Sequence, residues 1–254
     1  MNWYKKSQFN SGFDKITLDM YIKLLDDLLD KENEIPEYIA NEIPENIASD
    51  SEIQKLLNTH LEWNNGAKHW YLNDNLRHRK NGPAIEHDNG CKEWFQNNLR
   101  HRIDGPAYIH PDGDKKWYLN DKLHREDGPA IEYPSGSKKW FLNGLMHRED
   151  GPSVVEPNGN KEWYINGKRH RKDGPAVERS NGNKKWFIDG KLHREDGPAV
   201  ENADGDKMWY RNNKRHRMDG PAVINANGNK YWFIDDIELT EAQFNERTGI
   251  KWKK

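Results

Sequence analysis

The chain repeats itself with a constant period. Tryptophan occurs at positions 94, 117, 140, 163, 186, 209 and 232, which gives a 23-residue period. A His-Arg pair recurs at the same interval from His101-Arg102 to His216-Arg217, and one extra residue separates Trp70 from His78 in the first of eight repeats. A fixed period of this length indicates an array in which each unit packs mainly on its neighbours.

The low apolar content of the chain is compatible with a folded array only because the aromatic residues recur at fixed positions of the repeat. Apolar residues make up 33% of the chain and charged residues 32%, a balance that is otherwise typical of disorder. Here 11 Trp, 10 Tyr and 7 Phe supply core material in register. No apolar run is long enough for a membrane span, and the sequence contains no signal-peptide h-region. Cys91, the single cysteine, is interpreted as structural and indicates a reducing, cytoplasmic compartment.

Two turn signals divide each repeat into a short and a long leg. The first turn, such as Asn166-Gly167, contains only Gly, Asn or Asp, which tolerate the positive φ of a two-residue type I′ hairpin. The second turn, such as Asn181-Gly182, ends in Gly throughout. The short leg 160–165 alternates like a strand, and Asp173-Gly174-Pro175 predicts a kink in the long leg 168–180. The predicted fold is mainly β, an elongated single-layer antiparallel β-meander of about eight units with two strands each.

The array is predicted to lie between two helical segments. Residues 1–60 read as a small α-helical N-terminal head that caps the first repeat, and residues 61–237 form the repeat array. Residues 238–254 read as a short capping helix and tail, because Thr240 and Gln243 match a capping box at a helix start. We expect each helical segment to cover one open edge of the sheet.

Three ladders of side chains supply the candidate binding residues. Tyr or Phe follows every repeat Trp, Lys precedes it by two residues, and the Arg of each His-Arg pair stands two residues before an Asp in most repeats. The aromatic residues either form a docking platform or only pack on one another to stabilise a thin sheet. The cations form either a phosphate-binding stripe or ion pairs with nearby carboxylates. The structural interpretation is preferred in both cases. The candidates are Tyr118, Phe141, Tyr164, Phe187, Tyr210, Lys138, Lys161, Lys184, Arg148, Arg171 and Arg194.

The sequence predicts no catalytic residue, no cofactor and no metal site. Repeated His residues would lie about 9–10 Å apart along a ladder, too far to share an ion, so we expect them to hydrogen-bond the Asp-Gly-Pro bend. No nucleophile elbow, phosphate-binding glycine loop or HExxH motif is present. A residue repeated seven times is typical of a structural or multivalent device, whereas an active site is usually unique.

The repeat pattern W-[YF]-x-[ND]-[GND]-x-x-H-R-x-D-G-P-A resembles the MORN-type repeat family, in its degenerate variants. The array is also similar to repeat proteins encoded by bacteriophages and large DNA viruses, which often end in a segment like Glu238–Phe244. The resemblance covers residues 61–247. It implies β-hairpin sheets that serve as interaction or assembly platforms, sometimes at membranes. His-Arg-x-Asp-Gly-Pro stands here where a His-Gly-x-Gly run is usual in the family.

Three functions are compared on these observations. The first is a non-enzymatic scaffold that binds another protein, as a phage- or virus-encoded protein acting on a host protein in the host cytoplasm. The alternative is a nucleic-acid or nucleotide binder, although residues 61–254 carry 34 basic and 30 acidic side chains, a weak excess for that role. The third is an enzyme whose site includes His60, His69 and Arg77. The identity of the partner and the oligomeric state stay open.

Overall fold

A computed structural model describes Leu25, Asp27 and residues 59–72, 76–79 and 82–250. The predicted helical head, residues 1–60, therefore lies outside the described residues apart from Leu25, Asp27, Thr59 and His60. The described chain is mainly β and antiparallel, and it divides into two compact parts, residues 1–122 and 123–254. Among the described residues from Thr59 onward there is one helix, and it is too short to cross a membrane.

The first part is built on a hairpin that opens the repeat array. Strand β1 (Thr59–Asn64) pairs with β2 (Ala67–Leu72), and β2 also pairs with β3 (Leu76–Arg77) and β4 (Ile85–His87). The ladder continues through β5 (Lys92–Glu93), β8 (Tyr108–Ile109) and β9 (Lys115–Lys116), and β6 (Phe95–Gln96) forms a side hairpin with β7 (Leu99–Arg100). Strand β10 (Tyr118–Leu119) follows at the end of this part, and β11 (Lys122–Leu123) spans the boundary at which the two parts are divided.

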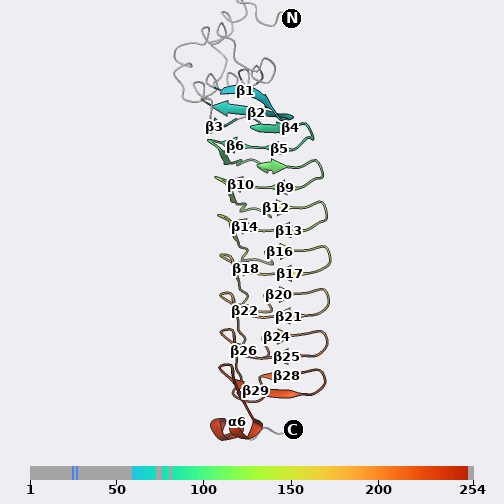
Figure 1. The fold of residues 1–254 in the computed structure, drawn as a ribbon, viewed down its shortest axis with the longest axis vertical. Helices are drawn as coiled ribbons and strands as arrows, with labels where there is room; N and C mark the ends of the chain where they lie inside the picture. The colour runs from blue at the N-terminus through green and yellow to red at the C-terminus, as the bar shows by residue number, and fades with distance from the viewer. Residues whose placement is uncertain (1–24, 26, 28–58, 73–75, 80–81, 251–254) are drawn as a thin grey trace, which may run out of the picture. The chain divides into compact units, whose positions relative to one another are not determined.

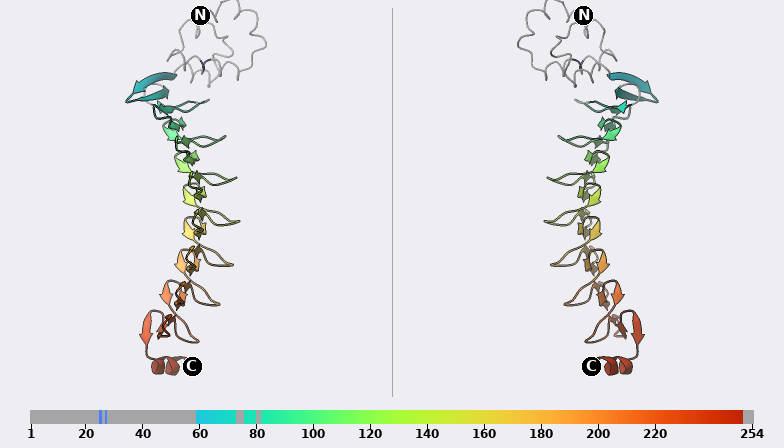
Figure 2. Two further views of the ribbon diagram at one scale, coloured as in Figure 1. Left: turned by 90° about the vertical axis from the view of Figure 1, so that its right-hand side faces the viewer. Right: turned by 90° about the vertical axis from the view of Figure 1, so that its left-hand side faces the viewer.

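The second part repeats one arrangement of two hairpins. Its ladder runs through β12 (Ile131–Glu132), β13 (Lys138–Lys139), β16 (Val154–Val155), β17 (Lys161–Glu162), β20 (Val177–Glu178), β21 (Lys184–Lys185), β24 (Val200–Glu201), β25 (Lys207–Met208), β28 (Val223–Ile224), β29 (Lys230–Ile234) and β30 (Ile237–Leu239). Side hairpins join β14 (Phe141–Leu142) to β15 (Leu145–Met146), β18 (Tyr164–Ile165) to β19 (Lys168–Arg169), β22 (Phe187–Ile188) to β23 (Lys191–Leu192), and β26 (Tyr210–Arg211) to β27 (Lys214–Arg215). Within this part the hairpins follow one another in chain order (Figures 1 and 2). The predicted antiparallel meander with a 23-residue period is confirmed.

The prediction that the short leg 160–165 is one unbroken strand is wrong, because this leg breaks at its Trp. Trp163 lies between β17 and β18, donates its N–H to the carbonyl of Ala176 at 2.8 Å and accepts from the N–H of His170 at 3.1 Å. Ala176 and His170 lie on opposite sides of the predicted kink at 173–175, and this kink is confirmed. Since the kink pushes residues 171–175 out of the ladder, the two halves of the long leg meet the short leg on either side of Trp163.

The two turns of each repeat have different geometries. Asn166 and Gly167 have φ of 49° and 76°, so the first turn is the predicted type I′ hairpin. In the second turn only Gly159 has positive φ, 91°. There the Gly159 N–H donates to the Glu156 carbonyl at 2.9 Å, and the Glu156 N–H donates to the Asn160 carbonyl at 3.0 Å. These bonds enclose a three-residue loop with glycine in the left-handed position.

The core of each repeat is thin. Its centre is an alanine that is fully buried wherever it occurs in the bend, as at Ala176, flanked by a buried β-branched residue such as Val177. A small side chain is needed because the Trp backbone hydrogen-bonds directly across it. At the end of the array, α6 (Glu241–Thr248) has the predicted Thr240–Gln243 capping box and buries Phe244 completely.

Candidate interaction surface

The arginine of a bend packs against the repeat tryptophan. The Arg171 guanidinium carbon lies 4.1 Å from the centre of the Trp163 ring, a cation–π distance. On the other side, a Cβ added to Gly174 would lie 2.9 Å from that carbon. The guanidinium is therefore sandwiched between an indole and a glycine. The same stack, at 4.0 to 4.2 Å, joins Arg79 to Trp70, Arg102 to Trp94, Arg148 to Trp140, Arg194 to Trp186 and Arg217 to Trp209.

The N–H groups of this arginine are also used inside the repeat. Arg171 donates from Nε to Asp173 at 3.3 Å and from Nη1 to the Pro175 carbonyl at 3.2 Å and to Glu178 at 2.9 Å. The predicted Arg–Asp pairing across the bend is confirmed. The candidate side chains Arg148, Arg171 and Arg194 are only 25%, 23% and 21% exposed. The group that each of these bends presents outward is its carboxylate, since the Asp is more than 80% exposed in all three.

The repeated histidines link consecutive repeats, and the expectation that they bind the Asp-Gly-Pro bend is wrong. His147 Nδ1 lies 2.9 Å from Asn166 Oδ1, and the Asn166 N–H donates to the same nitrogen at 3.2 Å. His170 meets Asp189 in the same way. Each ring therefore holds the first turn of the following repeat. The other ring nitrogen, His147 Nε2, lies 3.7 Å from Glu149 Oε1 in its own bend.

The aromatic candidates Tyr118, Phe141, Tyr164, Phe187 and Tyr210 are all half-buried. The Arg169 guanidinium lies between two of them, 5.5 Å from the Tyr164 ring and 5.6 Å from the Phe187 ring. The corresponding residue is again an arginine at Arg100 and Arg215, and it is Met146 or Leu192 in two other side hairpins. The row is thus a packed ladder with an intercalated side chain in each step, and only part of each ring faces solvent.

The lysine candidates Lys138, Lys161 and Lys184 are exposed on the ladder strands. Each has an acidic cross-strand neighbour: Glu132 pairs with Lys138, Glu178 lies between Lys161 and Lys184, and Glu201 follows Lys184. The residue between Lys138 and Lys161 is Val155. Opposite charges at such positions attract each other across the strands. From Lys161 to Glu201 the charges on this face therefore alternate in sign, so the lysines do not form a continuous cationic stripe.

The residues of the enzyme hypothesis lie on three strands of the first part. His60 on β1 and Arg77 on β3 are both cross-strand neighbours of Tyr71 on β2. His69 stacks on Tyr71 with ring centres 5.9 Å apart, and burial lowers its pKa. The enzyme hypothesis stays a hypothesis.

Glu162 is the most strongly bonded acid of the second part. Only 9% exposed, it accepts from the Tyr164 hydroxyl at 2.7 Å, from Arg169 Nε at 3.1 Å and from Arg179 Nη2 at 2.6 Å. Burial acts to raise the pKa of Glu162, but the bond from Tyr164 and the two arginines outweigh it and hold the pKa below its ordinary value of 4.5. The folded state therefore binds this proton less readily than the unfolded chain.

We expect Glu162→Gln to cost about 2 kcal/mol of unfolding free energy at neutral pH, because it removes a charged acceptor of three hydrogen bonds. A lowered folded pKa contributes stability that is complete above 4.5 and is lost as the pH falls through the folded pKa. The difference between wild type and variant should therefore shrink on acidification. Urea unfolding from neutral to acid pH measures it, and a constant difference would contradict the titration of Glu162.

Two matching grooves lie between successive bends of the second part. The first, about 680 Å³, has Trp163, Ile165 and His170 in its lining, with Glu149, Asp150 and Lys172 among its charged groups. The second, about 740 Å³, repeats the lining one unit later with Trp186, Ile188 and His193, and Lys172, Asp173, Glu195 and Asp196 supply its charges. Both grooves are open to solvent. The bends thus form a row of similar sites with aromatic and aliphatic linings and charged groups.

The residue at the tip of each bend changes while its surroundings do not. In His-Arg-x-Asp-Gly-Pro, all positions except x are the same in every repeat from His101 to Pro221. The tip residues are Ile103, Glu126, Glu149, Lys172, Glu195 and Met218, all of them exposed, with the side chains of Glu149 and Glu195 84% and 92% exposed. Reasoning from the sequence missed this position, although its variation inside a fixed hexapeptide was visible there.

Comparison with protein-family models and with curated proteins found no match. The likeness to MORN-type repeats rests on the sequence pattern, and the structure shows a β-hairpin meander that repeats with the same period as the sequence.

Proposed function

We propose that this chain is a non-enzymatic scaffold that binds another protein along the bends of its second part. The observation that carries the proposal is the row of matching grooves whose framework is fixed and whose tip residue varies. Repeat arrays present extended binding surfaces of this kind, in which each unit contributes a similar contact. A fixed Trp, His and Arg hold the shape, and the tip can set the preference for one partner.

The charges and spacing of the grooves define the partner. Exposed carboxylates of Glu149, Asp150, Glu195 and Asp196 stand at the two grooves, with Lys172 between them. An extended segment with apolar side chains for the grooves and basic ones for the carboxylates complements them. Two strand spacings separate successive repeats, about 9–10 Å, which is about three residues of an extended chain. We therefore expect one anchoring side chain in every three.

The resemblance to phage- and large-virus-encoded repeat proteins extends the proposal. On that basis the scaffold is MORN-like, and its partner is a host protein that it meets in the host cytoplasm. The nucleic-acid alternative needs cations free to face phosphates. The stacked arginines and the glutamates that flank Lys184 support the protein partner over that alternative.

The test is affinity capture from a cell lysate with the full chain as bait, reading out both protein and nucleic acid. A variant with Glu149, Lys172 and Glu195 all replaced by alanine should retain a discrete partner about tenfold less well, equivalent to about 1.4 kcal/mol. The matched control replaces Lys138, Lys161 and Lys184 by alanine and should capture the partner like wild type.

The control variant also tests the alternative. If nucleic acid is captured, falls off steeply with salt and is lost in the lysine variant while the tip variant retains it, the scaffold proposal fails. A partner held equally by both variants would contradict the bends as the binding surface.

A further inference from the structure

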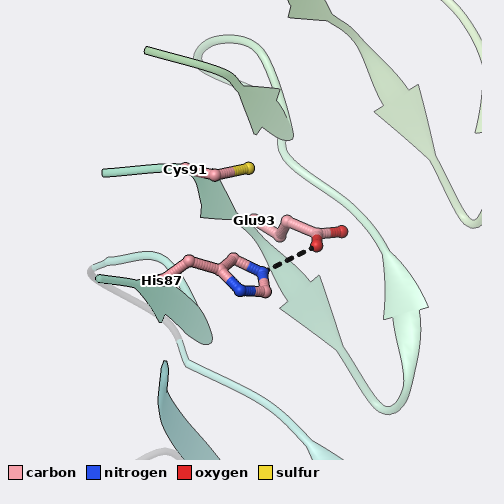
Figure 3. A group of neighbouring side chains, drawn as sticks. All are labelled: His87, Cys91 and Glu93. Atoms are coloured by element: carbon pink, nitrogen blue, oxygen red, sulfur yellow. Dashed lines mark hydrogen bonds and ion pairs between the residues drawn. The ribbon is translucent and has the colours of Figure 1, made fainter. Parts of the chain in front are cut away.

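Three side chains that can bind a metal meet at one place in the first part. His87 ends β4, Cys91 follows the second turn, and Glu93 ends β5; Figure 3 shows their side chains together. One nitrogen, the sulfur and one carboxylate oxygen all lie within 4.8 Å of one another, and His87 Nε2 is 3.4 Å from Glu93 Oε1. Cys91 and Glu93 are 5% and 9% exposed.

The hairpin between β4 and β5 explains why the three side chains converge. The His87 N–H donates to the Cys91 carbonyl at 2.9 Å, which closes the turn and sets these two residues opposite each other. Glu93 is two residues beyond Cys91, so both side chains point to the same face of the sheet. The backbone thus brings an imidazole, a thiol and a carboxylate to one spot.

The same three positions occur three repeats later as Glu156, Asn160 and Glu162. There Asn160 Nδ2 donates to Glu156 at 2.8 Å, and Arg179 occupies the second oxygen of Glu162. These contacts confirm that the positions meet, and they show the ordinary arrangement, a set of hydrogen bonds. In the first part His87 stands at the position of Glu156 and Cys91 at the position of Asn160. A nitrogen donor thus replaces a carboxylate, and a sulfur donor replaces an amide.

One carboxylate oxygen of Glu93 binds an arginine, and the other oxygen faces the cluster. Arg100 Nε and Nη2 both lie 2.9 Å from Glu93 Oε2, as Arg169 binds Glu162 in the later repeat. Glu93 Oε1 faces His87 instead of an arginine. A carboxylate oriented from behind by an arginine, with one oxygen directed at a nitrogen and a sulfur donor, is arranged like a metal ligand with its supporting hydrogen bond.

We propose that His87, Cys91 and Glu93 bind a zinc ion. Thiolate, imidazole and carboxylate are the ligands that Zn²⁺ takes in proteins, and the thiolate disfavours the hard cations Mg²⁺ and Ca²⁺. Ligand atoms around tetrahedral zinc lie about 3.5 Å apart, so small side-chain rotations close the set. Three protein ligands leave the fourth position to water.

The repeated histidines lie too far apart to share an ion, but His87 is not one of them. The ion would tie β4 to β5 near the start of the array.

The test uses the full chain, stripped of metal, with Co²⁺ and Zn²⁺ as probes. We expect one equivalent of Zn²⁺ to bind, and the Co²⁺ form to show the charge-transfer absorption of a thiolate–cobalt bond. Cys91→Ser should abolish that absorption and weaken Zn²⁺ binding by about 100-fold or more, since loss of a supporting residue alone costs about 10- to 100-fold. His87→Asn and Glu93→Gln should weaken binding as well.

Matched controls exclude adventitious binding by the other histidines. Asn160→Ser and Glu162→Gln change the equivalent positions of the later repeat, and His110→Asn changes the histidine one repeat on from His87; all three should bind Zn²⁺ like wild type. The wild-type chain offers a second readout. Its single thiol is only 5% exposed and should react slowly without metal, and its rate of reaction with a small thiol reagent should fall further on adding one equivalent of Zn²⁺. A rate that Zn²⁺ does not change, or equal Zn²⁺ binding by Cys91→Ser, would overturn the proposal.

Discussion

Replacing Arg171 by alanine is expected to destabilise the second part of the chain by about 3 kcal/mol. The substitution removes the stack on Trp163 at 4.1 Å, worth about 1–2 kcal/mol when partly desolvated. It also removes the hydrogen bonds to Asp173, the Pro175 carbonyl and Glu178. Bonds to charged groups are among the stronger ones, and the empty space between indole and Gly174 adds to the loss.

Urea unfolding of the full chain, followed by tryptophan fluorescence, measures this effect. Lys172→Ala is the matched control, since it alters the adjacent, exposed tip and should change the unfolding free energy by less than about 0.5 kcal/mol. Arg171→Lys separates charge from shape: an ammonium keeps the charge but cannot stack flat or reach three acceptors. We expect it to lose most of the stability. A lysine variant as stable as wild type would contradict the stacked arrangement.

Local features of the fold were predictable because each depends on a few adjacent residues. The type I′ turn at Asn166-Gly167, the kink at 173–175 and the capping box at Thr240 follow from the backbone preferences of their own side chains. The pairing of Arg171 with Asp173 was predictable for the same reason, since the partners are two residues apart. Period and turn chemistry together were enough for the antiparallel meander.

Contacts between repeats were not predictable in the same way, because repetition offers several equivalent partners. His170 has Asp173 near it in sequence, yet its ring meets Asp189 in the next repeat. Alternation placed Trp163 inside a strand, and only its bonds to Ala176 and His170 show that the strand breaks there. Which partner is chosen depends on how far the kink turns the chain.

The cluster proposed to bind zinc was not predicted from the sequence, for a related reason. Reasoning from the sequence interpreted Cys91 as structural, at a position where most other repeats carry Asn, Asp or Ser, and it did not single out His87 or Glu93. Their significance depends on the turn that sets the first two opposite each other. A search of the repeat for places where two or more unusual metal-binding residues fall close together would have found them.

Gly174→Ala is expected to destabilise the second part by about 2 kcal/mol through overpacking, although the added group is a single methyl. The new Cβ would lie 2.9 Å from Arg171 Cζ and 3.1 Å from its Nε. Gly174 does not have a positive φ, so the backbone accepts alanine and the cost is steric. An arginine on the surface would move aside, but Trp163 blocks this one from behind. Overpacking of this kind costs about 1–3 kcal/mol.

A double-mutant cycle identifies the source of that cost. In the Arg171→Ala background there is no guanidinium for the methyl to meet, so Gly174→Ala should cost little and the two effects should be strongly non-additive. Urea unfolding of the two single variants, the double variant and wild type gives the coupling energy. An undiminished cost in the double variant would place the strain elsewhere in the bend. A glycine variant as stable as wild type would mean that the arginine is free to leave the tryptophan, and the rigid framework beneath the bend tips would then lose its main support.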